Sequence, residues 1–499
     1  MPKRVSFNQL LGFTKRAILL EAYNAKTLGE GDVPFSDTQG VHIYSDLKLE
    51  MSLAAAEDEE GAYRNLQILQ VYATAAESAA VPAGISILEI QGQRIHFLKE
   101  VESDGSVDLE ALYAMCRIFH GVATREIGRL IGGTEFSIRM AADCGRAFLL
   151  KSSGLDESES IVSLGVPANR PAKKLARNVG DNGVPAGHLA FNIASLTDSD
   201  AEAQWEIIDL REESILALAA NQQILLESAN DVFKSRNSTA MTKLARDFSP
   251  NPNNPVHQPL RRQGFMMRAD LDGFSARVRD AMNGSDEDAY ELVRDFHSIM
   301  QYPAAFKETL PSGIKVLLFP WAGDCSNMLL ECEDYELERT YLPNTAALNW
   351  HDQGRGTGLG GKTNWRKVLG ETKWLVALAG GENDGADHGY ILTGNVEAMG
   401  RTFHVGAGWG WRRSLDAEQS KGTKAEETVI QKEDFDGLDT DLQKPFRDHP
   451  YHPTLFKVAS FEGLAKSNRE RRNEIRISAP AIVPATKAVI PAPRPYLNR

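Results

Sequence analysis

One short stretch decides how this chain folds: Met267-Arg268-Ala269-Asp270-Leu271-Asp272-Gly273-Phe274-Ser275. An apolar run ends in the acid Asp270, Gly273 makes a turn, and Ser275 opens an amphipathic helix. This order predicts a carboxylate at the end of a strand, directly before a helix whose first N–H groups have no partner within the helix. Such a corner can hold a metal ion and a phosphate chain together. On its own, the pattern also fits an ordinary strand-turn-helix corner.

A second acid, Asp324, stands in Phe319-Pro320-Trp321-Ala322-Gly323-Asp324-Cys325-Ser326-Asn327-Met328, a segment typical of two short strands that reverse at Gly323-Asp324. The order Asp-x-x-Gly-Phe, helix, strand and Gly-Asp hairpin resembles the catalytic domain of the class III nucleotidyl cyclases. In that family two aspartates hold two metal ions. The resemblance implies that Asp270, Asp324 and the backbone of Leu271 bind two Mn²⁺ or Mg²⁺ ions.

Composition limits the class of protein. The chain has 499 residues and a formal net charge of −13, with 42% hydrophobic and 25% charged residues, as in ordinary soluble globular proteins. The length predicts two to three domains, and the negative charge argues against a nucleic-acid partner. No run reaches the ~20 apolar residues of a membrane span, and the start of the chain lacks the apolar segment of a signal peptide.

The cysteines agree with this class. The four cysteines show no Cys-x-x-Cys spacing, so the sequence indicates neither a zinc site nor a disulfide framework. We expect reduced, buried thiols in a cytoplasmic protein.

The chain divides by pattern and composition into five segments. We expect an N-terminal extension at 1–40, a first unit at 41–180, a helical connector and linker at 181–261, a second unit at 262–416, and a charged and proline-rich tail at 417–499.

The two units share four landmarks in one order, which indicates an internal repeat. Each has a strand ending in an acid, a helix with Ala-Tyr, a glycine-turned hairpin, and a glycine turn into a helix. The landmarks are Asp46, Ala62-Tyr63, Gly92-Gln93 and Gly165 in the first unit, and Asp270, Ala289-Tyr290, Gly323-Asp324 and Gly406 in the second. The resemblance implies an α+β fold with two tandem ferredoxin-like cyclase domains, packed as a pseudo-twofold pair. A monomer would then contain the whole pair.

The two units keep different parts of the family's motifs. The second unit has both acids, but Gly410 stands where the family has an asparagine, four residues after Gly406. The first unit has Asp46, but Leu49-Glu50 replaces Gly-Phe, and Gln93 stands at the position of the second acid. One carboxylate and one amide make a poor site for two divalent ions. We therefore expect metal binding in the second unit only.

The first unit keeps the motif that the second has lost. Asn169 lies four residues after Gly165, and Lys173 four residues later, so both share one face of the predicted helix. The resemblance implies that both are catalytic: Asn169 orients the ribose, and Lys173 offsets charge in the transition state. Lys173 replaces the family's arginine, which keeps the charge and loses the bidentate fork. Lys174 is the rival for this role, and a helix cap is the alternative role of Asn169.

The resemblance thus implies one complete site per chain, between the two units, and one degraded site. The substrate would be a nucleoside triphosphate whose ribose 3′-hydroxyl attacks the α-phosphorus in line, so that pyrophosphate leaves. The metal ions would lower the pKa of that hydroxyl. The backbone N–H groups of Gly273, Phe274 and Ser275 would bind the substrate phosphates.

The base-reading positions depart from the family. Purine-specific members use a lysine four residues before the Gly-Asp aspartate and an acid three residues before the late glycine, where this chain has Pro320 and Phe403. Neither side chain can read a purine edge by hydrogen bonds. Phe319 and Trp321 would narrow a base pocket if they face it; the alternative is that both are core residues.

This departure resembles the bacterial pyrimidine cyclases of Pycsar anti-phage systems, which make cyclic UMP or cyclic CMP. It implies UTP as the substrate in preference to CTP, use of Mn²⁺, a role in antiviral defence, and a separate effector protein that responds to the cyclic nucleotide. Two alternatives stay open: a purine cyclase with an unusual pocket, and a catalytically inactive cyclase-like nucleotide sensor. Retention of both Asp270 and Asp324 argues against the sensor.

Overall fold

The structure is a computed structural model of the 499-residue chain. It describes residues 3–4, 6–12, 34–49, 59–102, 104–132, 136–153, 159–177, 182–197, 202–211, 220–248, 260–319, 321–355, 368–369, 371–380, 390–407, 414, 416–418, 420 and 422–478.

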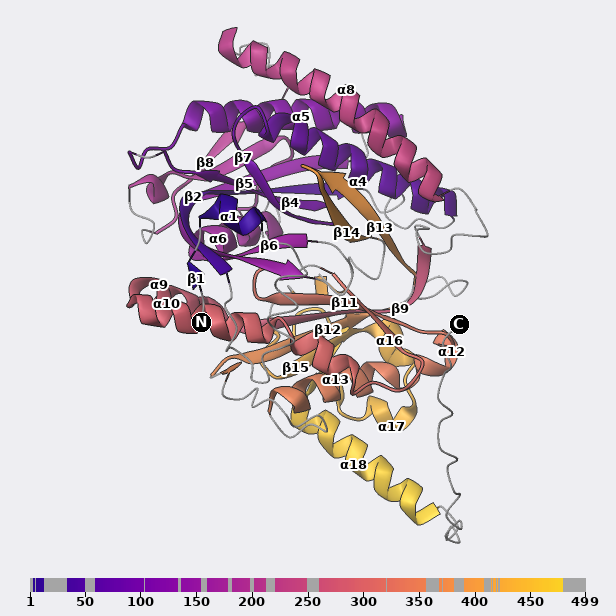
Figure 1. Cartoon of the computed structure of the whole chain (residues 1–499). Coiled ribbons are helices and arrows are strands. Elements are labelled where there is room, and N and C mark those ends of the chain that lie inside the picture. The colour runs from indigo at the N-terminus through magenta and orange to yellow at the C-terminus, as the bar shows by residue number, and fades with distance from the viewer. Residues whose placement is uncertain are drawn as a thin grey trace, which may run out of the picture.

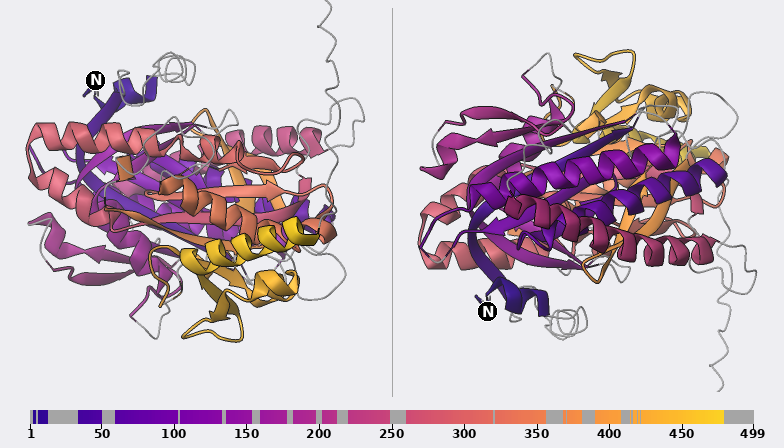
Figure 2. Two further views of the ribbon diagram at one scale, coloured as in Figure 1. Left: turned by 90° about the horizontal axis from the view of Figure 1, so that it is seen from below. Right: turned by 90° about the horizontal axis from the view of Figure 1, so that it is seen from above.

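The first unit is built on an 8-stranded sheet with the strand order β3-β4-β2-β5-β7-β8, to which β1 and β6 add at β2 and β5. The strands are β1 (Lys3–Arg4), β2 (Pro34–Leu49), β3 (Ser86–Gln91), β4 (Arg94–Glu100), β5 (Phe136–Ser153), β6 (Glu159–Leu164), β7 (His188–Asn192) and β8 (Trp205–Asp209). The helices are α1 (Phe7–Gly12), α4 (Glu59–Ala80), α5 (Leu109–Ile131), α6 (Val166–Ala176), α8 (Ala220–Phe248) and the 3₁₀ helix Ile193–Leu196. Seen from above, α4, α5 and α8 run side by side over the outer face of this sheet (Figure 2).

The second unit is built on a 9-stranded sheet with the order β10-β11-β9-β12-β15-β17-β16, and the hairpin β13-β14 pairs with β9. The strands are β9 (Leu260–Asp272), β10 (Lys315–Leu318), β11 (Cys325–Glu331), β12 (Lys373–Ala379), β13 (Tyr390–Ala398), β14 (Arg401–Ala407), β15 (Glu427–Gln431), β16 (Phe446–Asp448) and β17 (Phe456–Ser460). The helices are α9 (Phe274–Asn283), α10 (Asp286–Ile299), α11 (Tyr302–Lys307), α12 (Tyr335–Glu338), α13 (Leu342–Gly354), α16 (Lys432–Asp436), α17 (Thr440–Gln443) and α18 (Phe461–Ser478).

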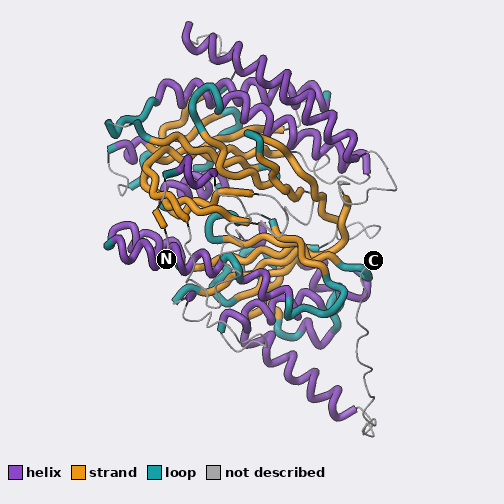
Figure 3. Tube along the Cα trace, in the orientation of Figure 1, coloured by secondary structure: helices purple, strands orange, loops and turns teal. Residues whose placement is uncertain are grey.

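The strand order confirms the internal repeat. In the first unit, β2 is antiparallel to β4 and β5, β5 is parallel to β7, and β7 is antiparallel to β8. In the second unit, β9 has the same relation to β11 and β12, β12 to β15, and β15 to β17. The predicted α+β fold of two tandem units is therefore correct. The two sheets face each other across the middle of the molecule, with most helices on the outside (Figures 1 and 3).

Each unit contributes a pair of strands to the hydrophobic core of the other. We call these pairs, β5-β6 of the first unit and β13-β14 of the second, the arms. Phe148 and Val162, from β5 and β6 of the first unit, belong to the core of the second. Phe403, from β14 of the second unit, belongs to the core of the first. The side-chain amide of Gln70 on α4 pairs with the backbone of Glu397 as a neighbouring strand would. It donates to the carbonyl of Glu397 and accepts from the backbone N–H of Glu397, both at 3.0 Å. The exchange buries apolar surface of both units and so holds them together.

The segment boundaries differ from those expected. Strand β2 begins at Pro34, β7 and β8 fall where a helical connector was expected, and β15, β17 and α18 fall in the expected tail. Strand β8 lies at the sheet edge with no buried residue, so its sequence lacks the alternation of a half-buried strand. In the expected tail, the strands are short and most residues between them are polar or charged, so the composition did not indicate folded structure. Residues 479–499 lie outside the described part.

Two further points concern single elements. Gly406 was expected at a turn into a helix, but it lies within β14, opposite Thr393 of β13. Of the helices that the structure describes, none combines the length and apolar character that a bilayer span requires.

Candidate active site

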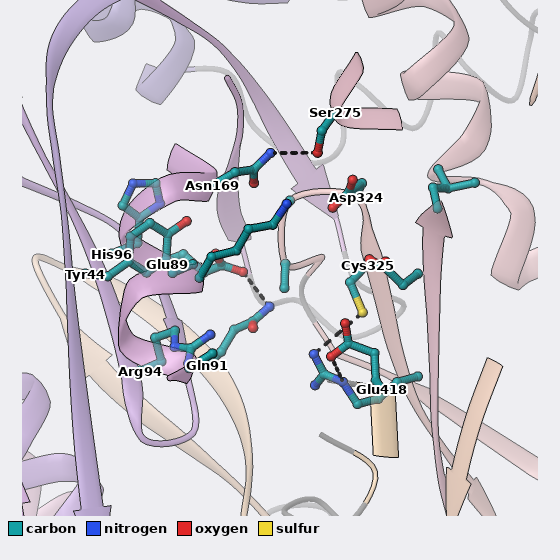
Figure 4. A pocket seen from close by; sticks show the side chains of 18 of the residues that line it. Tyr44, Glu89, Gln91, Arg94, His96, Asn169, Ser275, Asp324, Cys325 and Glu418 are labelled. Carbon is teal, nitrogen blue, oxygen red and sulfur yellow. Dashed lines mark hydrogen bonds and ion pairs between the residues drawn. The ribbon is translucent and has the colours of Figure 1, made fainter. Parts of the chain in front are cut away.

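A cavity of about 470 Å³ lies between the two units (Figure 4). Its polar lining comes from both: Tyr44, Glu89, Gln91, Arg94, His96, Asn169 and Lys173 from the first unit, and Arg268, Asp270, Asp272, Ser275, Asp324, Cys325 and Glu418 from the second.

The strand-turn-helix corner of the second unit forms one wall of this cavity. Strand β9 carries Asp270 near its end, and Gly273 adopts the left-handed backbone region with a φ of 82°, which favours glycine. Helix α9 then starts at Phe274, whose side chain is buried and packs on Phe296. The cavity is lined by Gly273 and Ser275, so Phe274 can contribute only its backbone N–H there. Leu271 is likewise a core side chain, which leaves its backbone for the cavity.

The Gly-Asp hairpin brings the second acid to the same place. Gly323 has a φ of 60°, and Ala322 and Cys325 close the turn through an isolated bridge. Cys325 stands directly opposite Asp270 in the β11–β9 register. Asp324 is the residue before Cys325, so both acids meet at the same end of the sheet and line the same cavity.

The electrostatics of this pair favour a bound cation. Burial raises the pKa of Asp270 well above the ordinary value, and repulsion from Asp324 and Glu418 raises it further. Burial likewise raises the pKa of Asp324, against the opposing effect of Lys173. Buried, mutually repelling carboxylates keep their charge when divalent cations neutralise them.

The carboxylates of this pair fit Mg²⁺ or Mn²⁺ as ligands that act together with substrate phosphates. In the described part of the chain, no three or more Asp, Glu, His or Cys side chains are grouped to hold a metal ion. Asp270 and Asp324 therefore offer a two-carboxylate site. Mg²⁺ is commonly bound in this manner, by one or two carboxylates together with substrate phosphates.

Helix α6 of the first unit forms the opposite wall. Its N-cap is Gly165, so Asn169 lies inside the helix, and the helix-cap alternative is excluded. The side-chain amide of Asn169 donates to the hydroxyl of Ser275 at 3.3 Å, across the boundary between the units (Figure 4). Lys173 lines the cavity. Lys174 points elsewhere: its ammonium donates to the carbonyl of Asn182 at 2.5 Å.

The corresponding corner of the first unit is filled by the chain's own cations. Asp46 forms an ion pair with Arg139 at 2.6 Å and lies 3.8 Å from Arg94. In register, Arg94 stands opposite Asp46 as Cys325 stands opposite Asp270. Gln93 was predicted to make this corner a poor metal site. In addition, two guanidinium groups lie next to Asp46, the one acid that remains.

The aromatic residues expected to narrow a base pocket are core residues. Phe319 packs with Met266 and Leu329, Trp321 contacts Phe296 edge to face, and Phe403 lies in the core of the first unit. None of the three lines the cavity. The steric argument against purines is therefore wrong, and the core alternative holds. Pro320 lies outside the described residues.

The sequence interpretation missed a polar wall on the first unit. Glu89, Gln91 and Arg94 line the cavity, and the amide of Gln91 donates to the Glu89 carboxylate at 2.6 Å. Burial raises the pKa of Glu89 to about 8. A signal for this residue existed: Glu89 lies four residues before Gln93, as Pro320 lies four before Asp324. The sequence interpretation applied this offset to the second unit, although the first unit supplies Asn169 and Lys173.

The second unit contributes a further pair that no motif indicated. Arg268 lies two residues before Asp270 on β9, and its guanidinium is 3.6 Å from the carboxylate of Glu418. Burial raises the pKa of Glu418. The lining of the cavity thus includes acids and cations from both units.

Comparison with known proteins gives two informative matches. No protein-family model matches the chain. It is 24% identical over 315 residues to a uridylate cyclase from Pseudomonas aeruginosa, a match that covers 58% of this chain and 58% of that relative. The crystal structure of a class III adenylyl cyclase-like ATP-binding protein from Pseudomonas aeruginosa superimposes with a TM-score of 0.56 at 18% identity. That match covers 87% of this chain and 91% of the other and is a likeness of fold.

Proposed function

Because the chain has the class III cyclase fold, we propose that it is a nucleotide cyclase that converts a pyrimidine nucleoside triphosphate, UTP in preference to CTP, to the 3′,5′-cyclic nucleotide and pyrophosphate. One observation carries the proposal: Asp270 and Asp324 of one unit line the same cavity as Asn169 and Lys173 of the other. Two acids for metal ions, an amide and a cationic group can supply the metal binding, orientation and charge neutralisation that this reaction requires.

Each group has a role in the proposed reaction. Two divalent cations held by Asp270 and Asp324 would lower the pKa of the ribose 3′-hydroxyl and neutralise part of the triphosphate charge. The N–H groups at the start of α9, where Gly273 and Ser275 line the cavity, would bind the phosphates, because the positive end of a helix favours anions. Asn169 orients the ribose, and Lys173 offsets the charge that develops as the bond from the 3′-oxygen to the α-phosphorus forms and the bond to pyrophosphate breaks.

The protonation state of Glu89 bears on the choice between UTP and CTP. An ionised carboxylate would accept a hydrogen bond from the ring N–H that uracil carries at N3, whereas the protonated acid would donate to N3 of cytosine, which is an acceptor. Burial raises the pKa of Glu89 to about 8, and the nearby Arg94 opposes this and favours the charged form, so the preference for UTP requires that the bound nucleotide and Arg94 keep Glu89 ionised. A buried group left without its partner costs about 1–3 kcal/mol, or roughly one to two decades in discrimination. The printed name of the distant relative, a uridylate cyclase, agrees with this choice.

Two alternatives each have an observation in their favour. Guanine also carries a ring N–H, so the same Glu89 carboxylate fits a guanylate cyclase, a purine enzyme with an unusual pocket. The structural neighbour is named an ATP-binding protein, which favours a nucleotide sensor that does not cyclise.

The test is a competition experiment. The purified chain receives Mn²⁺ and all four ribonucleoside triphosphates at equal concentration, and products are resolved by mass; the Asp324→Ala variant is the control. We expect cyclic UMP as the main product from the wild type and none from the variant. Cyclic GMP or cyclic AMP as the main product would replace the pyrimidine assignment with the purine one. Nucleotide binding without any cyclic product would favour the sensor.

The biological setting rests on the resemblance to Pycsar cyclases. The cyclic nucleotide would act as a messenger for a separate effector protein during phage infection. Cells that express the chain should then accumulate cyclic UMP after infection, and cells with the Asp324→Ala variant should not. Equal cyclic UMP before and after infection would contradict activation by phage.

A further inference from the structure

Helix α6 presents two neighbouring stripes of polar side chains to two different environments. Asn169 and Lys173 line the cavity. Arg170 and Lys174, each one position later, form a second stripe rotated by about 100° around the helix axis. The second stripe is directed at the first unit itself, because Arg170 approaches Asp143 of β5, and Lys174 donates to Asn182.

Asp143 is a buried carboxylate held from two sides. Its exposure is 0%, and its Oδ1 accepts a hydrogen bond from the side-chain amide of Asn192 on β7 at 2.9 Å. The guanidinium of Arg170 lies 3.6 Å from Oδ2. Asn192 is itself buried and accepts from the backbone N–H of Gln204 at 2.9 Å. The sheet therefore fixes the orientation of Asp143 independently of α6.

A fixed anion next to Arg170 constrains the rotation of α6. The helix spans Val166–Ala176, only 11 residues, and contains Pro171, which removes one backbone N–H from its hydrogen-bond ladder. Its buried apolar side chains, such as Leu175, hold it on the sheet, and the contact of Arg170 with Asp143 adds a charged constraint on its rotation. A rotation that takes Arg170 away from Asp143 leaves a buried charge without its partner, which is strongly unfavourable. The same rotation would withdraw Asn169 and Lys173 from the cavity.

We propose that Asp143 is a positioning residue for the cyclase reaction: through Arg170 it fixes the rotation of α6, so that Asn169 and Lys173 reach the reacting nucleotide. This inference rests on the proposed function. It assigns a catalytic consequence to a residue that lies behind the helix and does not line the cavity.

The test is a double-mutant cycle with Asp143→Asn, which keeps the size of the side chain and removes its charge. In the wild-type background we expect kcat to fall about tenfold with KM within about twofold, because small misplacements of catalytic groups act on the transition state. In the Asn169→Ala/Lys173→Ala background the same change should alter the rate less than about twofold, since the groups that it positions are gone.

Further variants separate positioning from folding. Arg170→Met should reproduce the effect of Asp143→Asn in both backgrounds and serves in its place if Asp143→Asn does not fold. Arg170→Lys should restore most of the activity because it keeps the charge. Arg177→Met, an exposed cation at the end of the same helix, is the matched control and should leave kcat unchanged.

The outcomes distinguish this inference from the proposed function. Equal rate losses in both backgrounds, or wild-type kcat in Asp143→Asn and Arg170→Met, would overturn the positioning role while the cyclase assignment stands. A wild-type chain that makes no cyclic nucleotide from any triphosphate would overturn the proposed function, and this inference with it.

Discussion

The two corners at Asp46 and Asp270 occupy the same place in the same fold and differ in what surrounds the acid. Asp270 has Cys325 opposite it on one neighbouring strand and Leu375 opposite it on the other. Asp46 has Arg94 and Arg139 at the corresponding positions. One acid is left to be neutralised from the cavity, and the other is neutralised within its own sheet. On the proposed function, the residues opposite the first acid, as much as the acid itself, would decide whether a corner is suited to metal ions.

The same comparison explains why a duplicated fold would have one site. The second unit keeps two acids and the first keeps α6, so each unit retains the half that the other lacks. Exchange of the β5-β6 and β13-β14 arms locks the two halves face to face. A composite site of this kind depends on both units, so a change in either half should affect it.

The largest expected effect separates the two acids. Asp270→Asn should lower kcat by about 10³-fold or more, because it removes the charge that holds the cations. Asp46→Asn should leave kcat within about threefold, but it should lower the free energy of unfolding by about 1–3 kcal/mol, since Arg139 loses its partner.

Steady-state kinetics and urea unfolding of both variants check this contrast. The circular dichroism spectrum of Asp270→Asn controls for its fold. A severe loss of kcat in Asp46→Asn would mean that the first corner takes part in the reaction.

The next effect concerns the half of the site on α6. Lys173→Ala should lower kcat by about 10²-fold, as the loss of one group that stabilises transition-state charge typically does. Lys173→Arg should keep most of the activity, because the class III cyclases that the chain resembles carry an arginine at this position. The measurement is kcat under saturating Mn²⁺ and nucleotide. If Lys173→Ala changed KM alone, Lys173 would contribute to ground-state binding and not to the transition state.

The residues that sequence reasoning placed in the site depend on local patterns. Asp270 precedes a glycine turn, Asp324 follows Gly323 in a hairpin, and Asn169 and Lys173 share a helical face; each pattern spans fewer than about ten residues. The repeat was predictable for the same reason, since its landmarks are local. The structure brings these residues to one cavity, and their catalytic roles stay predictions.

What sequence reasoning missed depends on non-local partners. Phe403 was expected at the base pocket, but it is buried in the other unit through the arm exchange, which leaves no mark on the local sequence. Strands β8 and β17 belong to their sheets because they pair with β7 and β15, and this pairing is not visible in their own local sequence. Glu89 lines the cavity where the two units meet. A motif identified within one unit does not show which residues of the other unit lie opposite.

A smaller effect follows from the protonation of the buried acids. Burial raises the pKa of Asp270 and Asp324, so the metal-free folded state binds more protons than the unfolded state above about pH 4. Their contribution to stability therefore declines as pH rises toward the raised native values. Mn²⁺ should reverse this loss, because it binds the deprotonated acids.

Thermal unfolding between pH 5 and pH 8 measures this effect. The increase in Tm on adding Mn²⁺ should grow with pH in the wild type, be nearly absent in Asp324→Asn, and persist in Asp46→Asn. A Mn²⁺ shift that does not change with pH would contradict proton competition at these two acids.

The smallest expected effect comes from restoring the missing acid of the first corner. Gln93→Asp places a carboxylate at the position that corresponds to Asp324, yet we expect no additional Mn²⁺ to bind and kcat to stay within about twofold. The reason is that Arg139 and Arg94 already neutralise Asp46, so the new acid meets cations of the protein itself. Adding Arg139→Leu, which copies Leu375 of the second unit, removes the closer of the two guanidinium groups.

Isothermal titration with Mn²⁺ and a non-hydrolysable triphosphate distinguishes the single from the double variant. An increase in bound Mn²⁺ in the double variant alone would show that Arg139 excludes metal from this corner. If Gln93→Asp alone gained Mn²⁺, the missing second acid would be the sole defect of the first unit. The guanidinium groups around Asp46 would then be compatible with a metal site, and the contrast between the two corners would reduce to one residue.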